Sequence, residues 1–166
     1  MFKPMTISKL TMDPITNSPI VILKEVYGEK TLPIWIGLME ATAIASKMEK
    51  IDFDRPMTHD LLKNILDMID VKVEKIEICD LKNNVYYALI HIAHNGGLMQ
   101  VDARPSDALA LSLRVNAPIF VSEEVIDKSR HIDLMSAEPE VKTEEGKKWQ
   151  EILENLNPED FGKYKM

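Results

Sequence analysis

Apolar and β-branched residues recur in short runs along the chain, and these runs predict a series of strands. The clearest run spans residues 72–80, where Val73, Lys75 and Glu77 alternate with Ile76 and Ile78. Residues 9–12 alternate only briefly, and the segment 13–19, rich in Asp, Asn and Pro, has the composition of a loop. The predicted strands are residues 20–26, 31–36, 72–80, 85–93, 98–103 and 118–121.

Apolar residues spaced three and four apart predict three helices, at residues 38–49, 58–69 and 106–116. The second has a stripe formed by Leu61, Leu62, Ile65, Leu66 and Ile69. Thr58 and Ser106 are residue types that favour the N-cap, and an acid follows each of them in the first turn. Residues 125–134 form a short helix or an irregular segment.

Strands joined by hairpin turns and interleaved with helices favour an α+β fold, with a mixed, mostly antiparallel sheet and packed helices. The two halves of the chain also resemble each other. An offset of 67 residues relates Ile34 to Val101 and Glu40 to Asp107. A duplicated unit of three strands and a helix explains this correspondence, and chance similarity is the alternative.

We expect one folded domain over residues 1–135, followed by a segment of different character over residues 136–166. The stretch 136–145 is acidic and lacks periodicity, which is typical of a linker. Beyond it, a second apolar stripe predicts a short amphipathic helix. That stripe consists of Trp149, Ile152, Leu153 and Leu156.

The composition predicts a cytoplasmic protein without a membrane span. No apolar run reaches about 18 residues, and no secretory signal begins the sequence. The single cysteine, Cys79, permits no intrachain disulfide. The formal net charge is −7 and no basic run is present, so any contact with nucleic-acid phosphates must come from a few placed groups.

Two segments share a pattern of Arg-Pro, then a hydroxyl residue, then an acid, then an apolar helix. They begin at Arg55 and Arg104. Helix N-termini attract anions, and a preceding guanidinium adds donors suited to phosphate. In strand 98–103, Asp102 is expected to point to the same face as Arg104. The candidate anion-binding residues are therefore Arg55, Thr58, Arg104 and Ser106.

Four residues are candidates for catalysis, namely His59, Asp60, Asp102 and Asp107. An imidazole titrates near neutrality, which makes His59 the most plausible acid or base. The carboxylates are suited to orienting water or a divalent cation such as Mg²⁺, although no spacing requires a metal. The same residues also admit a purely structural interpretation, with the hydroxyl residues as caps, Asp60 and Asp107 as first-turn acids, and Asp102–Arg104 as an ion pair.

The histidines of the second half do not form a metal site by spacing. His91 and His94 lie three residues apart in a predicted strand, so their side chains point to opposite faces. No zinc-binding motif is present in the sequence. The cofactor is therefore unknown from sequence, with a divalent cation possible.

At four ordered blocks the sequence resembles the bifunctional nuclease domain family. The resemblance covers residues 5–130 and implies a compact α+β domain with nuclease activity on DNA and RNA, an activity attributed chiefly to plant members. The matching blocks are residues 32–37 with Glu40 and Ala41, residues 55–62, residues 102–108 with Leu111 and Arg114, and residues 117–121.

Two functions follow as hypotheses. In the first, the protein is a nuclease in which His59 transfers protons while the arginines and helix ends hold the scissile phosphate. In the second, it is a non-catalytic regulatory domain that binds an anion or a partner and forms a homo-oligomer. The acidic charge and the apolar stripe of the tail helix favour the second hypothesis.

Overall fold

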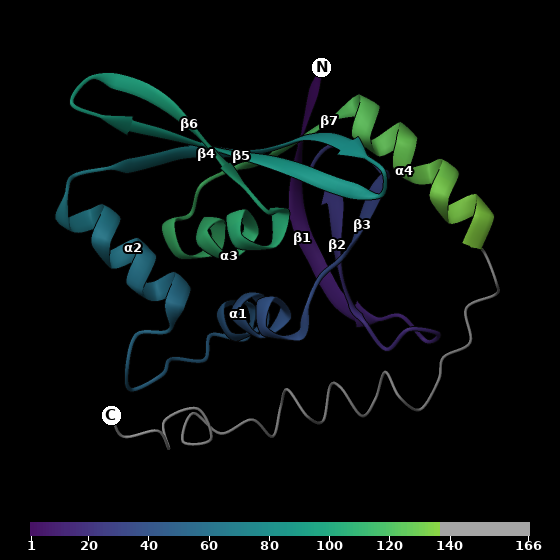
Figure 1. Ribbon diagram of the computed structural model, residues 1–166, viewed down its shortest axis with the longest axis horizontal. Helices are drawn as coiled ribbons and strands as arrows, with labels where there is room; N and C mark the ends of the chain where they lie inside the picture. Colours follow the sequence, from purple (N-terminus) through teal and green to yellow (C-terminus); the bar gives the residue numbers. More distant parts are fainter. Residues whose placement is uncertain (137–166) are drawn as a thin grey trace.

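The computed structural model describes residues 1–136, which form a seven-stranded sheet with four helices (Figure 1). This arrangement confirms the predicted α+β class. In chain order the elements are β1 (Phe2–Met12), β2 (Pro19–Glu25), β3 (Thr31–Trp35), α1 (Leu38–Met48), α2 (Thr58–Met68), β4 (Lys72–Lys82), β5 (Val85–His94), β6 (Gly97–Ala103), α3 (Pro105–Val115), β7 (Ile119–Ser122) and α4 (Glu123–Ser136).

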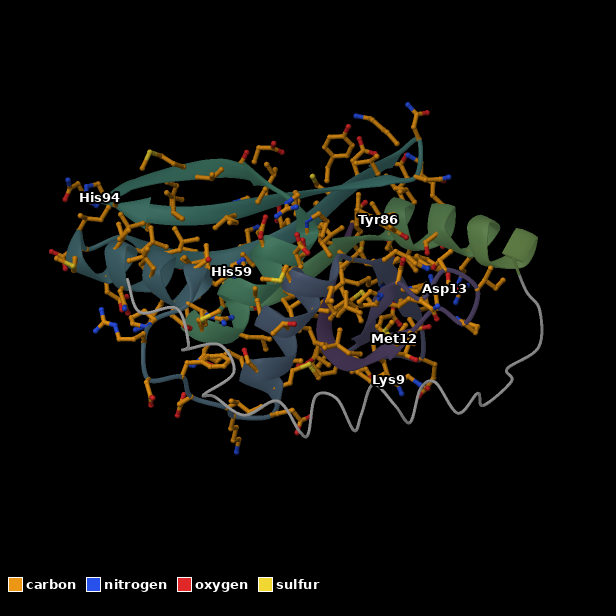
Figure 2. The ribbon with its side chains drawn as sticks, turned by 60° about the horizontal axis from the view of Figure 1, so that its bottom comes forward. Lys9, Met12, Asp13, His59, Tyr86 and His94 are labelled. Carbon is orange, nitrogen blue, oxygen red and sulfur yellow. The ribbon has the colours of Figure 1, made fainter. Side chains whose placement is uncertain are left out.

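The strand order is β3-β2-β1-β7-β4-β5-β6, so β7 joins two three-stranded meanders into one sheet. All neighbouring strands run antiparallel except β4 and β7, which are parallel. The hydroxyl of Tyr86 on β5 (labelled in Figure 2) donates a hydrogen bond to the Pro33 carbonyl of β3 at 3.1 Å. The sheet is therefore curled enough to bring β5 close to β3. The two edge strands are β3 and β6.

The two halves repeat the same local order. In each half, the first strand of the meander lies next to β7, the third strand lies at the edge, and a helix of eleven residues follows. Shifting the bounds of α1 by 67 residues gives the bounds of α3. This agreement in topology and length supports the duplicated unit that the offset predicts.

The strand β1 corrects the sequence prediction, which recognised alternation only in residues 9–12. The strand begins at Phe2, and Met5 is its only buried residue. Polar side chains at Lys3 and Thr6 dilute the apolar pattern. Pairing with β2 on one side and β7 on the other maintains the strand. Backbone hydrogen bonding thus defines an element that side-chain periodicity does not reveal.

The helices cover the sheet in two places. α1 packs on α3, α3 lies against β4 and β5, and α2 packs along α3. α4 contacts β3, β4 and β7, and Figure 1 shows it apart from the other three helices. The core between these layers consists of aliphatic side chains, the largest fully buried ones being Leu23, Leu32, Ile44, Ile76, Ile78, Leu109, Leu111 and Ile126. Within residues 1–136, no helix is both long enough and apolar enough to cross a membrane.

Candidate functional site

Polar side chains from the first turns of α1 and α2 contact residues at both ends of α3, in two separate sets of contacts. The third residue of each helix is acidic: Glu40 in α1, Asp60 in α2 and Asp107 in α3. Acids favour this position because the helix N-terminus carries partial positive charge and unpaired N–H groups. Figure 2 shows His59, the residue before Asp60, near the middle of the molecule. We call these residues together the three-helix junction, and its members are Glu40, His59, Asp60, Arg104, Asp107 and Arg114.

Arg104 links two of these helices. Its Nε donates to Asp107 Oδ2 at 2.8 Å, and its Nη1 donates to Glu40 Oε1 at 3.1 Å. Glu40 and Asp107 are the residues that the 67-residue offset relates, so the two repeated helix ends share one guanidinium. The hydrogen bond to Asp107 raises the pKa of Arg104. The side chain is 67% exposed, so its remaining nitrogen, Nη2, lies within reach of a ligand.

His59 forms an acid–base pair with the same carboxylate. Its Nε2 lies 2.9 Å from Asp107 Oδ1, and its side chain is 14% exposed. Burial by itself raises the pKa of Asp107, but hydrogen bonds from Arg104 and His59 outweigh burial, and the net pKa is lowered. An ionised carboxylate only accepts hydrogen bonds, so Nε2 of His59 carries the proton. In the neutral ring, Nδ1 is then the basic nitrogen.

Asp60 faces a different partner. Its Oδ1 accepts a hydrogen bond from Arg114 Nε at 2.7 Å, and its Oδ2 accepts one from the Met57 backbone N–H at 3.0 Å. Arg114 is 2% exposed and also donates to the Ala43 and Ala110 carbonyls. Although neighbouring residues in sequence, His59 and Asp60 thus contact different residues of α3. Asp60, a residue predicted as catalytic, thus joins α2 to the C-terminal half of α3.

The predicted caps are wrong at both helices. The residue that precedes α2 is Met57 and the residue that precedes α3 is Arg104, and neither helix has a capping side chain of its own at that position. Thr58 is the first residue of α2 and is exposed, whereas Ser106 is the second residue of α3 and only 7% exposed. In α2, Asp60 satisfies the backbone N–H that a cap residue leaves open, which is the N3 half of a capping box.

Asp102 does not share a face with Arg104, contrary to the prediction. Its neighbour Ala103 pairs with the fully buried Ala88, so alternation directs Asp102 away from the core and the helices. Arg104 follows the end of the strand and turns into α3. Burial chiefly, with a smaller contribution from the charge of Asp102, raises the pKa of Cys79 on β4. Asp102 therefore lies outside the three-helix junction.

Arg55 is a cation without a partner in the part of the chain that the structure describes. It lies in the loop between α1 and α2, three residues before α2, and its side chain is exposed. The neighbouring surface contains a cavity of about 380 Å³ between the C-terminal end of α1 and α2. Lys47, Asp54, Asp60, Lys63 and Arg114 are among the residues that line it. The chain neighbours of Arg55, Asp54 and Pro56, line this cavity, but Arg55 itself is not among its lining residues.

A second polar group, which the sequence analysis missed, lies on β4 and β5. Glu77 is 8% exposed, and its carboxylate accepts a hydrogen bond from His91 Nε2 at 2.7 Å and pairs with Lys75. Lys75 also lies over the ring of Phe120, 5.8 Å from its centre. Alternation in residues 72–80 placed Lys75 and Glu77 on one face, but only the register with β5 brings His91 opposite them.

The sequence analysis left the cofactor unknown and named the aspartates only as groups suited to a divalent cation. No group of three or more His, Cys, Asp and Glu residues in the described region is arranged to hold a metal ion. The carboxylates of Glu40 and Asp107 are both paired with Arg104. His91 and His94 bond to different groups, Glu77 and the Asp70 carbonyl, as their spacing predicts.

The mixed sheet and its packed helices define an α+β protein, in which a histidine–aspartate pair joins α2 to the first turn of α3. The model of the bifunctional nuclease domain matches residues 21–133, and the chain belongs to that family. The match includes every member of the three-helix junction. The resemblance noted from sequence is thereby confirmed.

Relatives fall into two groups. An uncharacterized protein of Mycobacterium tuberculosis is 35% identical over 149 residues, which cover 87% of this chain and 89% of the relative. Bifunctional nuclease 1 of Oryza sativa subsp. indica is 22% identical over 116 residues, and bifunctional nuclease 2 of Arabidopsis thaliana is 24% identical over 110 residues. The matched parts cover 35% and 33% of those two plant proteins. The nuclease name thus comes from longer and more distant relatives.

Proposed function

We propose that this protein hydrolyses phosphodiester bonds in DNA or RNA, or both, and that the His59–Asp107 pair performs the proton transfer. Membership of the bifunctional nuclease domain family supports the reaction class. The observation that carries the assignment of the site is the 2.9 Å contact between His59 Nε2 and Asp107 Oδ1. It orients one imidazole and fixes its tautomer, which is the arrangement of a general base.

In the proposed reaction, Nδ1 of His59 takes a proton from a water molecule. The water oxygen forms a bond to phosphorus as the bond from phosphorus to the leaving oxygen breaks. The imidazolium is stabilised by Asp107 and then returns its proton to the leaving oxygen, which restores the neutral ring. Asp107 stays ionised throughout, in keeping with its lowered pKa.

The phosphate would be held by Arg104 and Arg55. Nη2 of Arg104 is not used in its two ion pairs, and Arg55 has no partner among the described residues. Three carboxylates against two guanidinium groups leave the three-helix junction with a formal charge of −1 when His59 is neutral. Because this net charge does not attract a phosphate over a long range, binding depends on hydrogen-bond donors placed within contact distance.

A divalent cation remains a proposal that the described side chains do not support directly. Glu40 and Asp107 would be its protein ligands, but Arg104 competes for both carboxylates. We therefore route no step through a metal. Assays with Mg²⁺, with Mn²⁺ and with a chelator would establish whether a cation bound by substrate and protein together contributes.

The test is cleavage of single-stranded and double-stranded DNA and of RNA by the purified full-length protein and two histidine variants. His59→Gln removes the base, and we expect activity to fall by about 10²-fold or more, which is typical for general acid–base catalysis. The matched control is His94→Gln, because His94 lies at the β5–β6 turn, at one end of the molecule (Figure 2). Equal activity in both variants would refute the assignment of His59.

A carboxylate comparison separates the two aspartates that the sequence made equivalent. Asp107→Asn is expected to lose activity, as His59→Gln does, because it removes the group that orients and stabilises the imidazole. Asp102→Asn is expected to keep the activity, because Asp102 points away from the helices. A larger loss in Asp102→Asn than in Asp107→Asn would place the reaction on the other face of the sheet.

The alternative is a non-catalytic domain that binds an anion or a partner. The observation that favours it is that Arg104 and Arg114 are already paired with carboxylates, which is also what a structural cluster requires. Protein free of contaminating nuclease would then cut none of the substrates. It would still show a rise in melting temperature with phosphate or nucleotides, and Arg55→Gln would abolish that rise.

A further inference from the structure

The edge strand β6 lacks the features that normally protect a sheet edge. Proteins shield such strands with proline, with charged residues, especially lysine, or with bulges. The seven residues of β6 include no Pro, Lys or Arg, and Asp102 is their only charge. Its pairing with β5 continues without a register shift. The other edge, β3, has Pro33 at its centre.

Among the described residues, the surface around β6 is apolar and exposed. Leu98, Met99 and Val101 are 80%, 49% and 44% exposed. The helix α2 has a strongly amphipathic sequence, yet none of its residues is buried. Five large apolar side chains of and just after α2 are exposed by 38% or more, namely Leu61, Leu62, Ile65, Met68 and Ile69. Apolar surface of this extent marks an interaction site.

The two apolar regions belong to one side of the molecule. His94, at the end of β5, contacts the carbonyl of Asp70, which follows α2, so the β5–β6 turn lies at the C-terminal end of the helix. Figures 1 and 2 both show α2 at the same end of the molecule as this turn. Within α2, Lys63 and Asp67 form an ion pair at 2.6 Å, so these two charges offset each other. We call the exposed apolar residues of β6 and α2 together the β6–α2 surface.

We propose that two copies of this chain associate through the β6–α2 surface, with the two β6 strands pairing antiparallel about Gln100. In this register Gly97 faces Ala103 of the other copy, and Met99 faces Val101. Asp102 faces Leu98, so the two Asp102 carboxylates are kept apart. The pairing is isologous, because each contact occurs twice, and it continues the sheet of one copy into that of the other.

A second copy fits this surface because the strand is complementary to itself. A two-fold axis at Gln100 pairs all seven residues of β6 without an overhang. On the side of the sheet that carries the helices, it brings Met99 and Val101 of both copies together, next to the exposed stripes of the two α2 helices. Antiparallel pairing of apolar residues at such positions stabilises a sheet. This supplies the burial that α2 lacks within one chain.

The test is sedimentation velocity of the full-length protein over a range of concentrations. The chain has a mass of 18.9 kDa, and we expect a species of twice that mass. Val101→Glu introduces two buried charges at the proposed axis, and we expect it to give the monomer at concentrations where the unmodified chain is dimeric. The matched control is Val85→Glu, because Val85 is a similarly exposed strand valine, at 53%, in the β4–β5 turn region, and it is expected to leave the dimer intact.

Hydrogen exchange supplies a second measurement, and the core amides of β4 serve as its internal control for stability. The β6 amides should be protected in the dimer and exchange faster in Val101→Glu, while core amides of β4 stay protected in both. A monomer at all concentrations would overturn the proposal, as would a dimer that survives Val101→Glu with freely exchanging β6 amides. A monomer with protected β6 amides would also overturn it, and would assign the edge to another segment of the same chain.

Discussion

At the scale of single residues, Arg104 at the N-cap of α3 and Arg114 in its last turn differ in their exposure to water. Arg104 is 67% exposed and Arg114 is 2% exposed, although each pairs with a carboxylate. An exposed pair contributes little to stability because water solvates both charges. A buried pair is costly to break, since the remaining charge has no counterion and no water. The side chain of Arg104 is therefore accessible to a ligand, whereas that of Arg114 contributes to the stability of the fold.

The first prediction concerns the Asp60–Arg114 pair. Asp60→Asn leaves the Arg114 guanidinium buried without a counter-charge, and we expect the free energy of unfolding to fall by about 3–5 kcal/mol. The control is Asp67→Asn on the same helix, which breaks the exposed Lys63–Asp67 pair and should cost about 0.5 kcal/mol. Urea unfolding followed by circular dichroism measures both. Equal losses in the two variants would contradict the structural role of Asp60.

The second prediction concerns pH. The pKa values of Asp60 and Asp107 are lowered from their ordinary value of 3.8, so the folded state prefers the ionised carboxylates. Their contribution to stability is complete above pH 3.8 and is lost as the pH falls through the lowered pKa values. The free energy of unfolding should decrease with acid below that pH, with a shallower slope in Asp60→Asn. An unchanged slope in that variant would show that Asp60 is not the responsible group.

At the scale of elements, periodicity predicted most of the fold but not the ends of its helices. The strands β2 to β6 and three helices follow from apolar patterns, and these patterns predict the elements even where, as in α2 and β6, no residue is buried. β1 was recognised only in its last four residues, since its pairing leaves most side chains exposed. Caps at Thr58 and Ser106 were wrong because the acids at the third helix position form the local contacts instead. Glu40 was missed as a site residue, although its offset match to Asp107 pointed to it.

The third prediction concerns the end of α3. Asn116 follows the helix in the left-handed conformation, with φ of 55°, which asparagine and glycine tolerate and β-branched residues do not. Asn116→Val should lower the free energy of unfolding by about 1–2 kcal/mol. Asn116→Gly should change it by a few tenths of that amount. Denaturant unfolding of both variants tests this, and a similar effect of glycine and valine would argue against backbone strain as the cause.

At the scale of the whole molecule, duplication explains why the candidate site lies where it does. Two equivalent helices meet at their N-termini, and their equivalent acids, Glu40 and Asp107, share Arg104. The helix α2 lies in the connection between the halves, and its His59 contacts only one of those acids, Asp107. Sequence spacing could suggest both Arg-Pro segments, but it could not show that His59 meets Asp107 while Asp102 faces away. Those relations depend on sheet register and helix packing.

The most direct test of this account is a double-mutant cycle on cleavage rate, with His59→Gln, Asp107→Asn and the double variant assayed on the best substrate. Residues that act as one unit show strongly non-additive losses. We predict that the double variant is no slower than the slower single variant, within about threefold. Losses that multiply, or single variants that retain full activity, would contradict catalysis by the His59–Asp107 pair.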